Sequence, residues 1–141
     1  IIYKGRAFMS IVKLYDFSTL DDERGSLVVL DKPSGIPFEI KRVYYLFGAT
    51  GGISRGFHAH KKLHQIAICI SGHCRMVVDD GINKEDFLME SPSIGIDIPP
   101  MIWHEMHDFS VDCVLLVVAS NEYDEADYIR DYDSFKKASN L

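Results

Sequence analysis

Two histidines separated by one residue, His58 and His60, dominate a short run that begins with Arg55-Gly56 and leads into Gln65. Side chains alternate between the two faces of a β-strand, so both imidazoles project from one face. An imidazole with its ordinary pKa of ~6.5 exchanges protons near neutral pH, and the same ring binds transition metals. The pair therefore predicts a strand that carries a chemical site on one face.

The remaining sequence consists mainly of short apolar runs closed by Gly, Pro, Asp and Ser, which is the pattern of a β-sandwich or barrel. The predicted strands are 11–15, 26–30, 40–47, 56–60, 64–71, 74–79, 84–89, 93–98, 103–108 and 113–119. Only residues 124–138 have helical character, because apolar residues recur at three-residue steps and the acids precede Lys136-Lys137, as the helix dipole favours. The sequence predicts an all-β fold with a short C-terminal helix.

Composition narrows the class of protein further. With 141 residues, 47% hydrophobic and 26% charged, the chain is expected to form one water-soluble domain with its own core. No apolar run approaches the ~20 residues that cross a bilayer, so we expect no membrane partner. A formal net charge of −6 argues against nucleic acid as a partner.

The ends of the chain bear on the domain boundaries, and the cysteines bear on the cellular compartment. We expect residues 1–10 to be disordered or vector-derived, since Met9 reads like a natural start, and residues 11–141 to form the single domain. Cys69, Cys74 and Cys113 all lie in apolar runs without C-x-x-C spacing. An odd number of such cysteines suits reduced, packed thiols, which predicts a cytoplasmic protein.

The order of the site residues resembles the two sequence motifs of the cupins. His58, His60, Gln65 and Gly72 follow the first motif, and Gly95, Pro99, Pro100 and His104 follow the second. The resemblance implies a double-stranded β-helix, or jelly roll, in which His104 joins the other two imidazoles inside the barrel. It also implies that a Glu normally occupies the place of Gln65.

Gln65 affects the choice between metal and proton chemistry. A neutral amide oxygen is a poorer ligand for a divalent cation than a carboxylate, but it hydrogen-bonds well to an imidazole or a sugar hydroxyl. Acid–base chemistry is therefore favoured, while a metal held by His58, His60, Gln65 and His104 remains the alternative. We expect surface or supporting roles for the other histidines, which are His64, His73 and His107.

The run 40–47 offers candidate binding groups. Arg42 and Tyr44 share one face of this predicted strand, as an anionic pocket with a phenolic hydroxyl would require. A solvated Arg beside a packed Tyr is the alternative. Arg24 and Arg55 each precede a glycine at a strand entrance, where a guanidinium fork could grip phosphate oxygens.

Taken together, these residues resemble the small cupins that act as 3,4-ketoisomerases on dTDP-4-keto-6-deoxyglucose, relatives in fold of the dTDP-sugar 3,5-epimerases. The similarity runs from about Lys13 to Lys137. The matching segments are 24–27, 36–38, 41–45, 55–62, 79–81, 103–109, 123–125 and 127–130. It implies a reaction without metal or other cofactor, in which the C3 proton is removed to give an enediol and a proton returns to C4.

The resemblance also implies roles for individual residues. His58 and His60 would carry the proton transfers, and Tyr44 would be their hydroxyl partner. The expected substrate-binding residues are Arg24, Arg42, Arg55, Gln65 and His104. The sequence leaves open which histidine meets C3 and which C4 configuration, galacto or gluco, the product has.

Partners follow from the same family. The resemblance implies a homodimer with exchanged N-terminal strands, for which 11–15 is the candidate, and a 3-keto product destined for amination in surface-polysaccharide (O-antigen) synthesis. A metal-dependent cupin enzyme and a non-catalytic sugar-binding cupin are the competing hypotheses.

Overall fold

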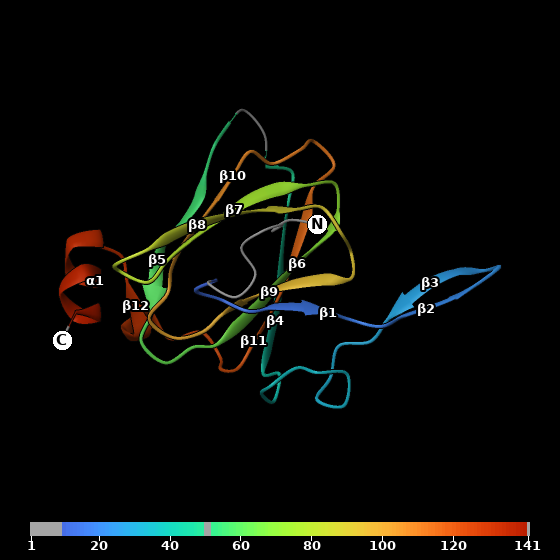
Figure 1. Cartoon of the computed structure of the whole chain (residues 1–141), viewed down its shortest axis with the longest axis horizontal. Coiled ribbons are helices and arrows are strands. Elements are labelled where there is room, and N and C mark those ends of the chain that lie inside the picture. Colours follow the sequence, from blue (N-terminus) through green and yellow to red (C-terminus); the bar gives the residue numbers. More distant parts are fainter. Residues whose placement is uncertain (1–9, 50–51, 141) are drawn as a thin grey trace.

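A computed structural model describes residues 10–49 and 52–140, which fold into two facing antiparallel sheets (Figure 1). The first sheet has the strand order β1-β9-β6-β11-β4. Its strands are Leu14–Asp16 (β1), Ile94–Ile98 (β9), Gln65–Ser71 (β6), Val114–Ala119 (β11) and Arg42–Phe47 (β4).

The second sheet has the order β12-β5-β10-β7-β8. Its strands are Tyr128–Ile129 (β12), Arg55–His60 (β5), Trp103–His107 (β10), Cys74–Asp79 (β7) and Lys84–Met89 (β8). The chain passes from one sheet to the other between β4, β5, β6 and β7, and again between β8, β9, β10 and β11. This alternation gives the all-β jelly roll with a C-terminal helix that the sequence predicted.

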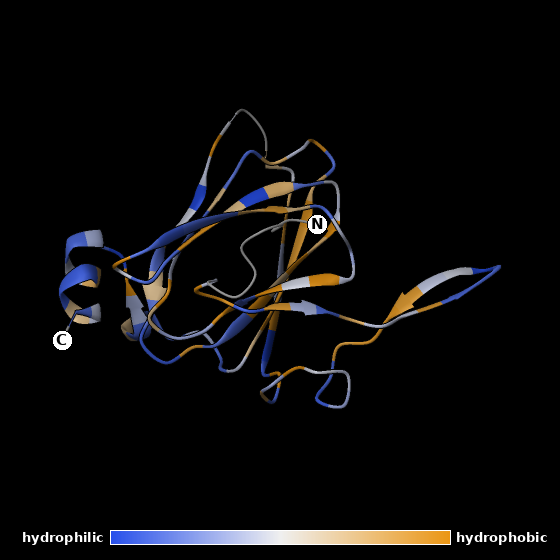
Figure 2. Ribbon diagram, in the orientation of Figure 1, coloured by the Kyte–Doolittle hydropathy of each residue, from blue (hydrophilic) through white to orange (hydrophobic). Residues whose placement is uncertain are grey.

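The core lies between the two sheets, and the apolar residues of the strands gather there (Figure 2). In β8 every second residue is buried, which is the two-residue period of a half-buried strand. The three cysteines belong to this core with 0–3% of their surface exposed, which confirms that they are packed thiols.

The C-terminal segment differs from the single helix that we predicted over 124–138. It contains a 3₁₀ turn (η2, Glu125–Asp127), the short strand β12 and then an α-helix (α1, Tyr132–Ser139). Asp131 caps α1 by accepting a hydrogen bond from the backbone N–H of Ser134, so the helix begins late. The residues before it instead pair with β5, where Tyr128 lies opposite His60.

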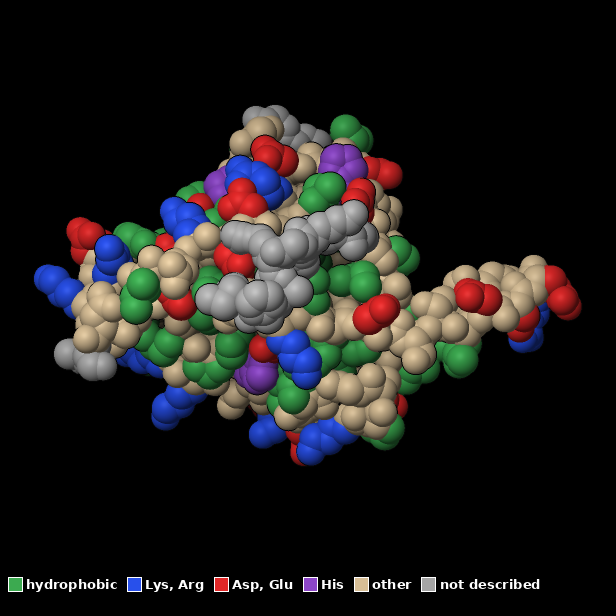
Figure 3. Space-filling model, viewed as in Figure 1, with side chains coloured by type: hydrophobic (Ala, Val, Ile, Leu, Met, Phe, Trp, Pro, Cys, Tyr) green, Lys and Arg blue, Asp and Glu red, His purple; other side chains and the backbone are tan. Residues whose placement is uncertain are grey.

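A hairpin that the sequence did not predict in full projects from the barrel (Figures 1 and 3). It consists of Thr19–Asp22 (β2) and Gly25–Val28 (β3), which pair only with each other. All four residues of β2 are exposed, so no buried alternation marked it as a strand.

At the N-terminal end, Ser10 belongs to the folded domain, since its hydroxyl donates to Glu85 Oε1 at 3.0 Å. The rest of the 1–10 segment lies outside the described residues. Among those that are described, no helix is long and apolar enough to cross a membrane.

Candidate active site

A β-bulge in β5 positions the first histidine. In the pairing with β10, His58 lies opposite His104 and Gly56 lies opposite Glu105, which leaves Phe57 without a partner. Both bulge residues have positive φ, 94° at Gly56 and 59° at Phe57. A Cβ on Gly56 would lie 2.9 Å from the backbone oxygen of His104, so only glycine permits this close approach of the two strands.

The bulge brings three imidazoles together inside the barrel, as the sequence predicted. The ring centroid of His58 lies 4.6 Å from that of His104 and 4.9 Å from that of His60. Each ring can offer one nitrogen to a common point, and these three nitrogens lie within 4.8 Å of one another. His60 and His104 are buried, while His58 is half-buried.

Backbone carbonyls orient two of the rings. The Nδ1 atoms of His58 and His104 lie 3.0 Å from the carbonyl of Gly56 and 3.3 Å from that of Ile102. A carbonyl only accepts, so Nδ1 carries the proton and Nε2 keeps its lone pair. Nδ1 of His60 is different, because it is buried and makes no hydrogen bond within the described chain.

Burial keeps these imidazoles neutral. It lowers the pKa of His104 to about 3, with a further contribution from His58. It lowers the pKa of His60 to about 4, helped by His58 and opposed by Asp127. The pKa of His58 is also lowered, mainly by burial. At neutral pH the cluster therefore consists of uncharged rings that can accept protons.

Tyr44 and Gln65 form a hydrogen-bonded pair beside the cluster. The Tyr44 hydroxyl donates to Gln65 Oε1 at 2.6 Å, and Gln65 is only 1% exposed. Burial raises the pKa of Tyr44 to about 12, so its hydroxyl stays protonated. The Arg42 guanidinium lies 5.0 Å from the centre of the Tyr44 ring, which confirms that both residues share the inner face of β4.

Sequence reasoning assigned no site role to Tyr128, although its ring lies 4.3 Å from that of His60 and 4.9 Å from that of His58. The Arg130 guanidinium lies 4.1 Å from the centre of this tyrosine ring and pairs with Glu125 at 2.8 Å. The sequence pattern predicts a helix over 124–138, which includes this segment. The signal for a later helix start is Asp131, which caps α1, while Tyr128 and Ile129 form β12 and extend the sheet.

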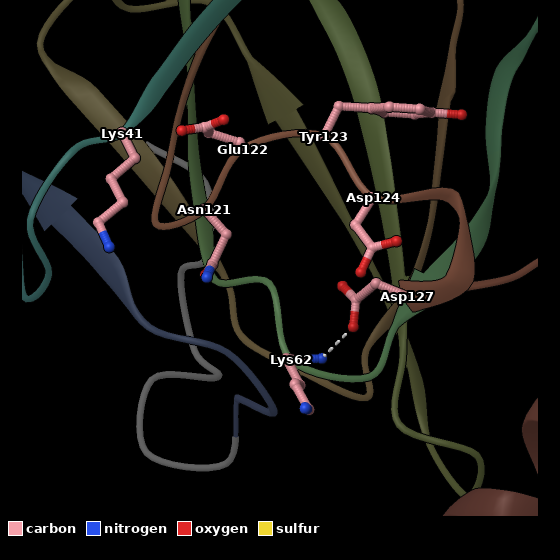
Figure 4. A pocket seen from close by; sticks show the side chains of 7 residues that line it. All are labelled: Lys41, Lys62, Asn121, Glu122, Tyr123, Asp124 and Asp127. Carbon is pink, nitrogen blue, oxygen red and sulfur yellow. Dashed lines mark hydrogen bonds between the residues drawn. The ribbon is translucent and has the colours of Figure 1, made fainter.

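Asp127, which contacts His60, is also part of the wall of a pocket of about 350 Å³ (Figure 4). Residues from the ends of β5 and β11 and from η2 contribute to its wall, which consists of Lys41, Lys62, Asn121, Glu122, Tyr123, Asp124 and Asp127. Asp127 belongs both to this wall and to the surroundings of His60, since its Oδ2 lies 3.4 Å from His60 Nδ1.

Two predicted binding residues do not contact the histidines of their own chain. Arg24 is on the projecting hairpin with 86% of its side chain exposed, and it pairs with Asp22. Arg55 is exposed at the start of β5, where it lines a separate pocket with Phe47 and Ile53.

The remaining histidines lie outside the cluster, as expected. His64 Nε2 lies 2.6 Å from Asp97 Oδ1, and His107 Nε2 lies 2.9 Å from Glu105 Oε1. His73 is exposed beside the Gly72 turn.

The fold and the site together define a cupin-type barrel with a histidine cluster in its lumen. Residues 10–140 match the family described as "FdtA: WxcM-like, C-terminal". The chain therefore belongs to this family, whose characterised relatives are sugar 3,4-ketoisomerases, and it is an isomerase.

Three relatives support this assignment. The chain is 53% identical over 125 residues to the TDP-4-oxo-6-deoxy-alpha-D-glucose-3,4-oxoisomerase of Aneurinibacillus thermoaerophilus, covering 89% of this chain and 90% of that protein. A 3,4-ketoisomerase from Helicobacter canadensis has a TM-score of 0.89 and 43% identity, covering 93% and 98% of the two chains. A histidine mutant of QdtA from Thermoanaerobacterium thermosaccharolyticum, in complex with TDP-4-keto-6-deoxyglucose, has a TM-score of 0.88 and 41% identity over 92% and 94%.

Proposed function

We propose that this enzyme converts dTDP-4-keto-6-deoxyglucose to a dTDP-3-keto-6-deoxyhexose by histidine acid–base catalysis. The observation that carries the proposal is the cluster of three neutral imidazoles beside a protonated phenol and a guanidinium. One of the relatives above is named for its action on this sugar, and another is in complex with it.

The reaction balances without an added reactant. A base removes the C3 proton, the C–H electrons form a C3=C4 double bond, and the C4 carbonyl oxygen takes up a proton to give an enediol. The O3 hydroxyl then loses its proton, the C3 carbonyl forms, and C4 takes a proton. We assign the proton transfers to His58 and His60, which accept protons because burial keeps them neutral.

Tyr44 and Arg42 would stabilise the charge that develops on the sugar oxygens. Tyr44 remains a proton donor at neutral pH because burial raises its pKa to about 12. Arg42 supplies a fixed positive charge on the same face of β4. Such groups stabilise an enediolate more effectively in a dry site than in water.

The functional unit in this proposal is a homodimer joined through the N-terminal region. The resemblance implies that strand 11–15 joins the partner's sheet, but β1, which begins at Leu14, pairs with β9 of its own chain. The β2–β3 hairpin is the better candidate, because it projects from the barrel and exposes Leu20 and Leu27 at 63% and 53%. It also carries Arg24 away from its own histidines, so that Arg24 would serve a second copy.

Proton NMR of dTDP-4-keto-6-deoxyglucose in D₂O with EDTA-treated enzyme tests the function. We expect loss of the C3 proton signal, a new 3-keto sugar and deuterium at C4. A parallel reaction in H₂O gives the C4 configuration from the coupling of the C4 and C5 protons. Turnover only after a metal is restored would support the metal alternative, which the spacing of the three histidine nitrogens within 4.8 Å favours. An unchanged sugar under both conditions would overturn the proposal.

A further inference from the structure

Backbone hydrogen bonds fix the position of Asp127, a residue of η2, next to the end of β5. Its Oδ1 accepts a hydrogen bond from the Lys62 backbone N–H at 2.8 Å, and its Oδ2 accepts one from the Leu63 N–H at 3.1 Å. Its own backbone carbonyl accepts from the Lys61 N–H at 2.9 Å. These three bonds attach η2 to the turn that follows His60, and Figure 4 shows the carboxylate in the wall of the pocket. The carboxylate therefore has a fixed position.

This fixed carboxylate faces a buried nitrogen of the cluster, Nδ1 of His60, that makes no hydrogen bond within the described chain. Asp127 Oδ2 lies 3.4 Å from Nδ1 of His60, a side chain that is only 3% exposed. A carboxylate that already accepts backbone N–H bonds can only accept again. The contact is therefore favourable only when Nδ1 carries a proton, which leaves the lone pair on Nε2.

We propose that Asp127 is a positioning residue that holds His60 as the Nδ1–H tautomer, so that Nε2 is the atom that exchanges protons with the sugar. The inference rests on the proposed function, because the acid–base role of His60 belongs to it. Asp127 itself touches no reacting atom. Its effect passes through the imidazole, as for a carboxylate that orients a catalytic histidine elsewhere.

Asp127 has a second effect, because its negative charge favours the protonated form of His60. The groups around His60 are His58 from β5, His104 from β10, Arg42 from β4 and Tyr128 from β12. His58 and Arg42 disfavour the imidazolium of His60, whereas Asp127 favours it. A 3.4 Å contact is long for a hydrogen bond, and it is expected to shorten when His60 takes up a proton, because a charge-assisted bond is stronger.

Asp127→Asn tests the proposal, with Asp124→Asn as the matched control. Asp124 also lines the pocket and lies beside Asp127 in Figure 4, but its carboxylate caps the Ala126 N–H and is not paired with His60. Both variants remove one negative charge from the same wall. In Asp127→Asn an NH₂ group, which cannot accept from a backbone N–H, replaces one carboxylate oxygen. With the amide oxygen kept on the Lys62 N–H, the NH₂ group takes the place of Oδ2, donates to His60 Nδ1 and moves the ring proton to Nε2.

The primary measurement is ¹⁵N–¹H NMR of histidine-labelled protein without sugar, which reports the tautomer and pKa of His60. We expect Nδ1–H in the wild type and in Asp124→Asn, and Nε2–H with a lower pKa in Asp127→Asn. Steady-state kinetics should show a kcat loss on the order of 10²-fold with KM nearly unchanged in Asp127→Asn alone.

The outcomes separate the inference from the proposed function. An Nε2–H tautomer of His60 in the wild type would overturn the positioning role, and this readout needs no variant to fold. Equal tautomers and equal kcat in the two variants would overturn it as well. An Nδ1–H tautomer that changes only in Asp127→Asn supports the role of Asp127, even if the wild-type enzyme fails to isomerise the sugar and the proposed function falls.

Discussion

The hydroxyl of Tyr44 in β4 donates a 2.6 Å hydrogen bond to Oε1 of Gln65 in β6. The two strands are not neighbours, because β11 lies between them in the sheet. The bond therefore spans a strand on the inner face and fixes the phenol near the histidines.

Replacing Tyr44 with Phe removes this donor and leaves the buried Oε1 of Gln65 unpaired. We expect a loss of about 1–3 kcal/mol in the free energy of unfolding, measured by urea denaturation. Tyr45→Phe is the control, since Tyr45 is 60% exposed on the opposite face of β4. Equal stability of the two variants would show that the bond contributes nothing.

Replacing His60 with Asn should leave the fold and nucleotide binding nearly intact while turnover falls roughly 10²–10⁴-fold, the usual contribution of an acid–base group. Circular dichroism, calorimetric titration with TDP and the NMR assay measure the three properties. A folded variant that retains the wild-type rate would remove His60 from the mechanism.

Acid should destabilise the protein through its buried histidines. An unfolded histidine takes up a proton near pH 6.5, whereas the pKa of folded His104 is about 3 and that of folded His60 is about 4. Between pH 6.5 and the lower pKa of the folded state, the unfolded chain therefore binds more protons than the folded protein. The free energy of unfolding falls as the pH drops below 6.5, by up to about 1.4 kcal/mol per pH unit for each of the two histidines.

Urea unfolding at pH 7 and pH 5 measures this dependence, and His104→Gln provides the comparison. Carboxylates contribute equally to the wild type and to His104→Gln. The difference between the pH dependences of their free energies of unfolding therefore isolates the contribution of His104. The variant should lose less stability than the wild type between the two pH values. Identical slopes would contradict the assignment of a neutral, buried imidazole.

Replacing Arg42 with Ala should weaken substrate binding more than it slows chemistry, because it removes a positive charge from the inner face of β4. We expect KM to rise about tenfold or more, as for the loss of a charged hydrogen bond. The pKa of His60 should rise too, since Arg42 helps to lower it. Lys41→Ala is the control, because it removes a positive charge from the adjacent residue. A similar KM in the two variants would mean that the position of Arg42 on the inner face of β4 does not matter for substrate binding.

The projecting hairpin should govern assembly. Leu27→Asp places a charge on an apolar side chain that is 53% exposed in the single chain, and we expect it to shift a dimer to monomers. Light scattering after size exclusion measures the mass. Val111→Asp is the control, because Val111 is 85% exposed and lies outside the hairpin. A monomeric wild type, or a dimeric Leu27→Asp, would contradict the proposed dimer.

The all-β fold and the shared face of His58 and His60 could be predicted because both depend on local alternation, while the jelly roll followed from the resemblance to the cupin motifs. His58 and His60 share a face through the period of a strand, and the second cupin-like motif supplied His104. The hairpin strand β2 was missed because all of its residues are exposed, and a strand without a buried face has no hydrophobic signal. Asp127 was missed for another reason: it meets His60 only through tertiary folding, and its spacing in the sequence carries no trace of that contact.

The bulge at Gly56-Phe57 has a further consequence for charge. By strict alternation Arg55 would share the face of Phe57 and Ala59, away from the imidazoles. Because the bulge adds one residue, Arg55 instead lies opposite Met106, whose side chain is buried in the core. Directly paired residues lie on the same face of a sheet, so Arg55 comes to the same side as His58. One extra residue thus gives β5 a charge gradient along its length, from the exposed Arg55 at its start to the buried His60 at its end.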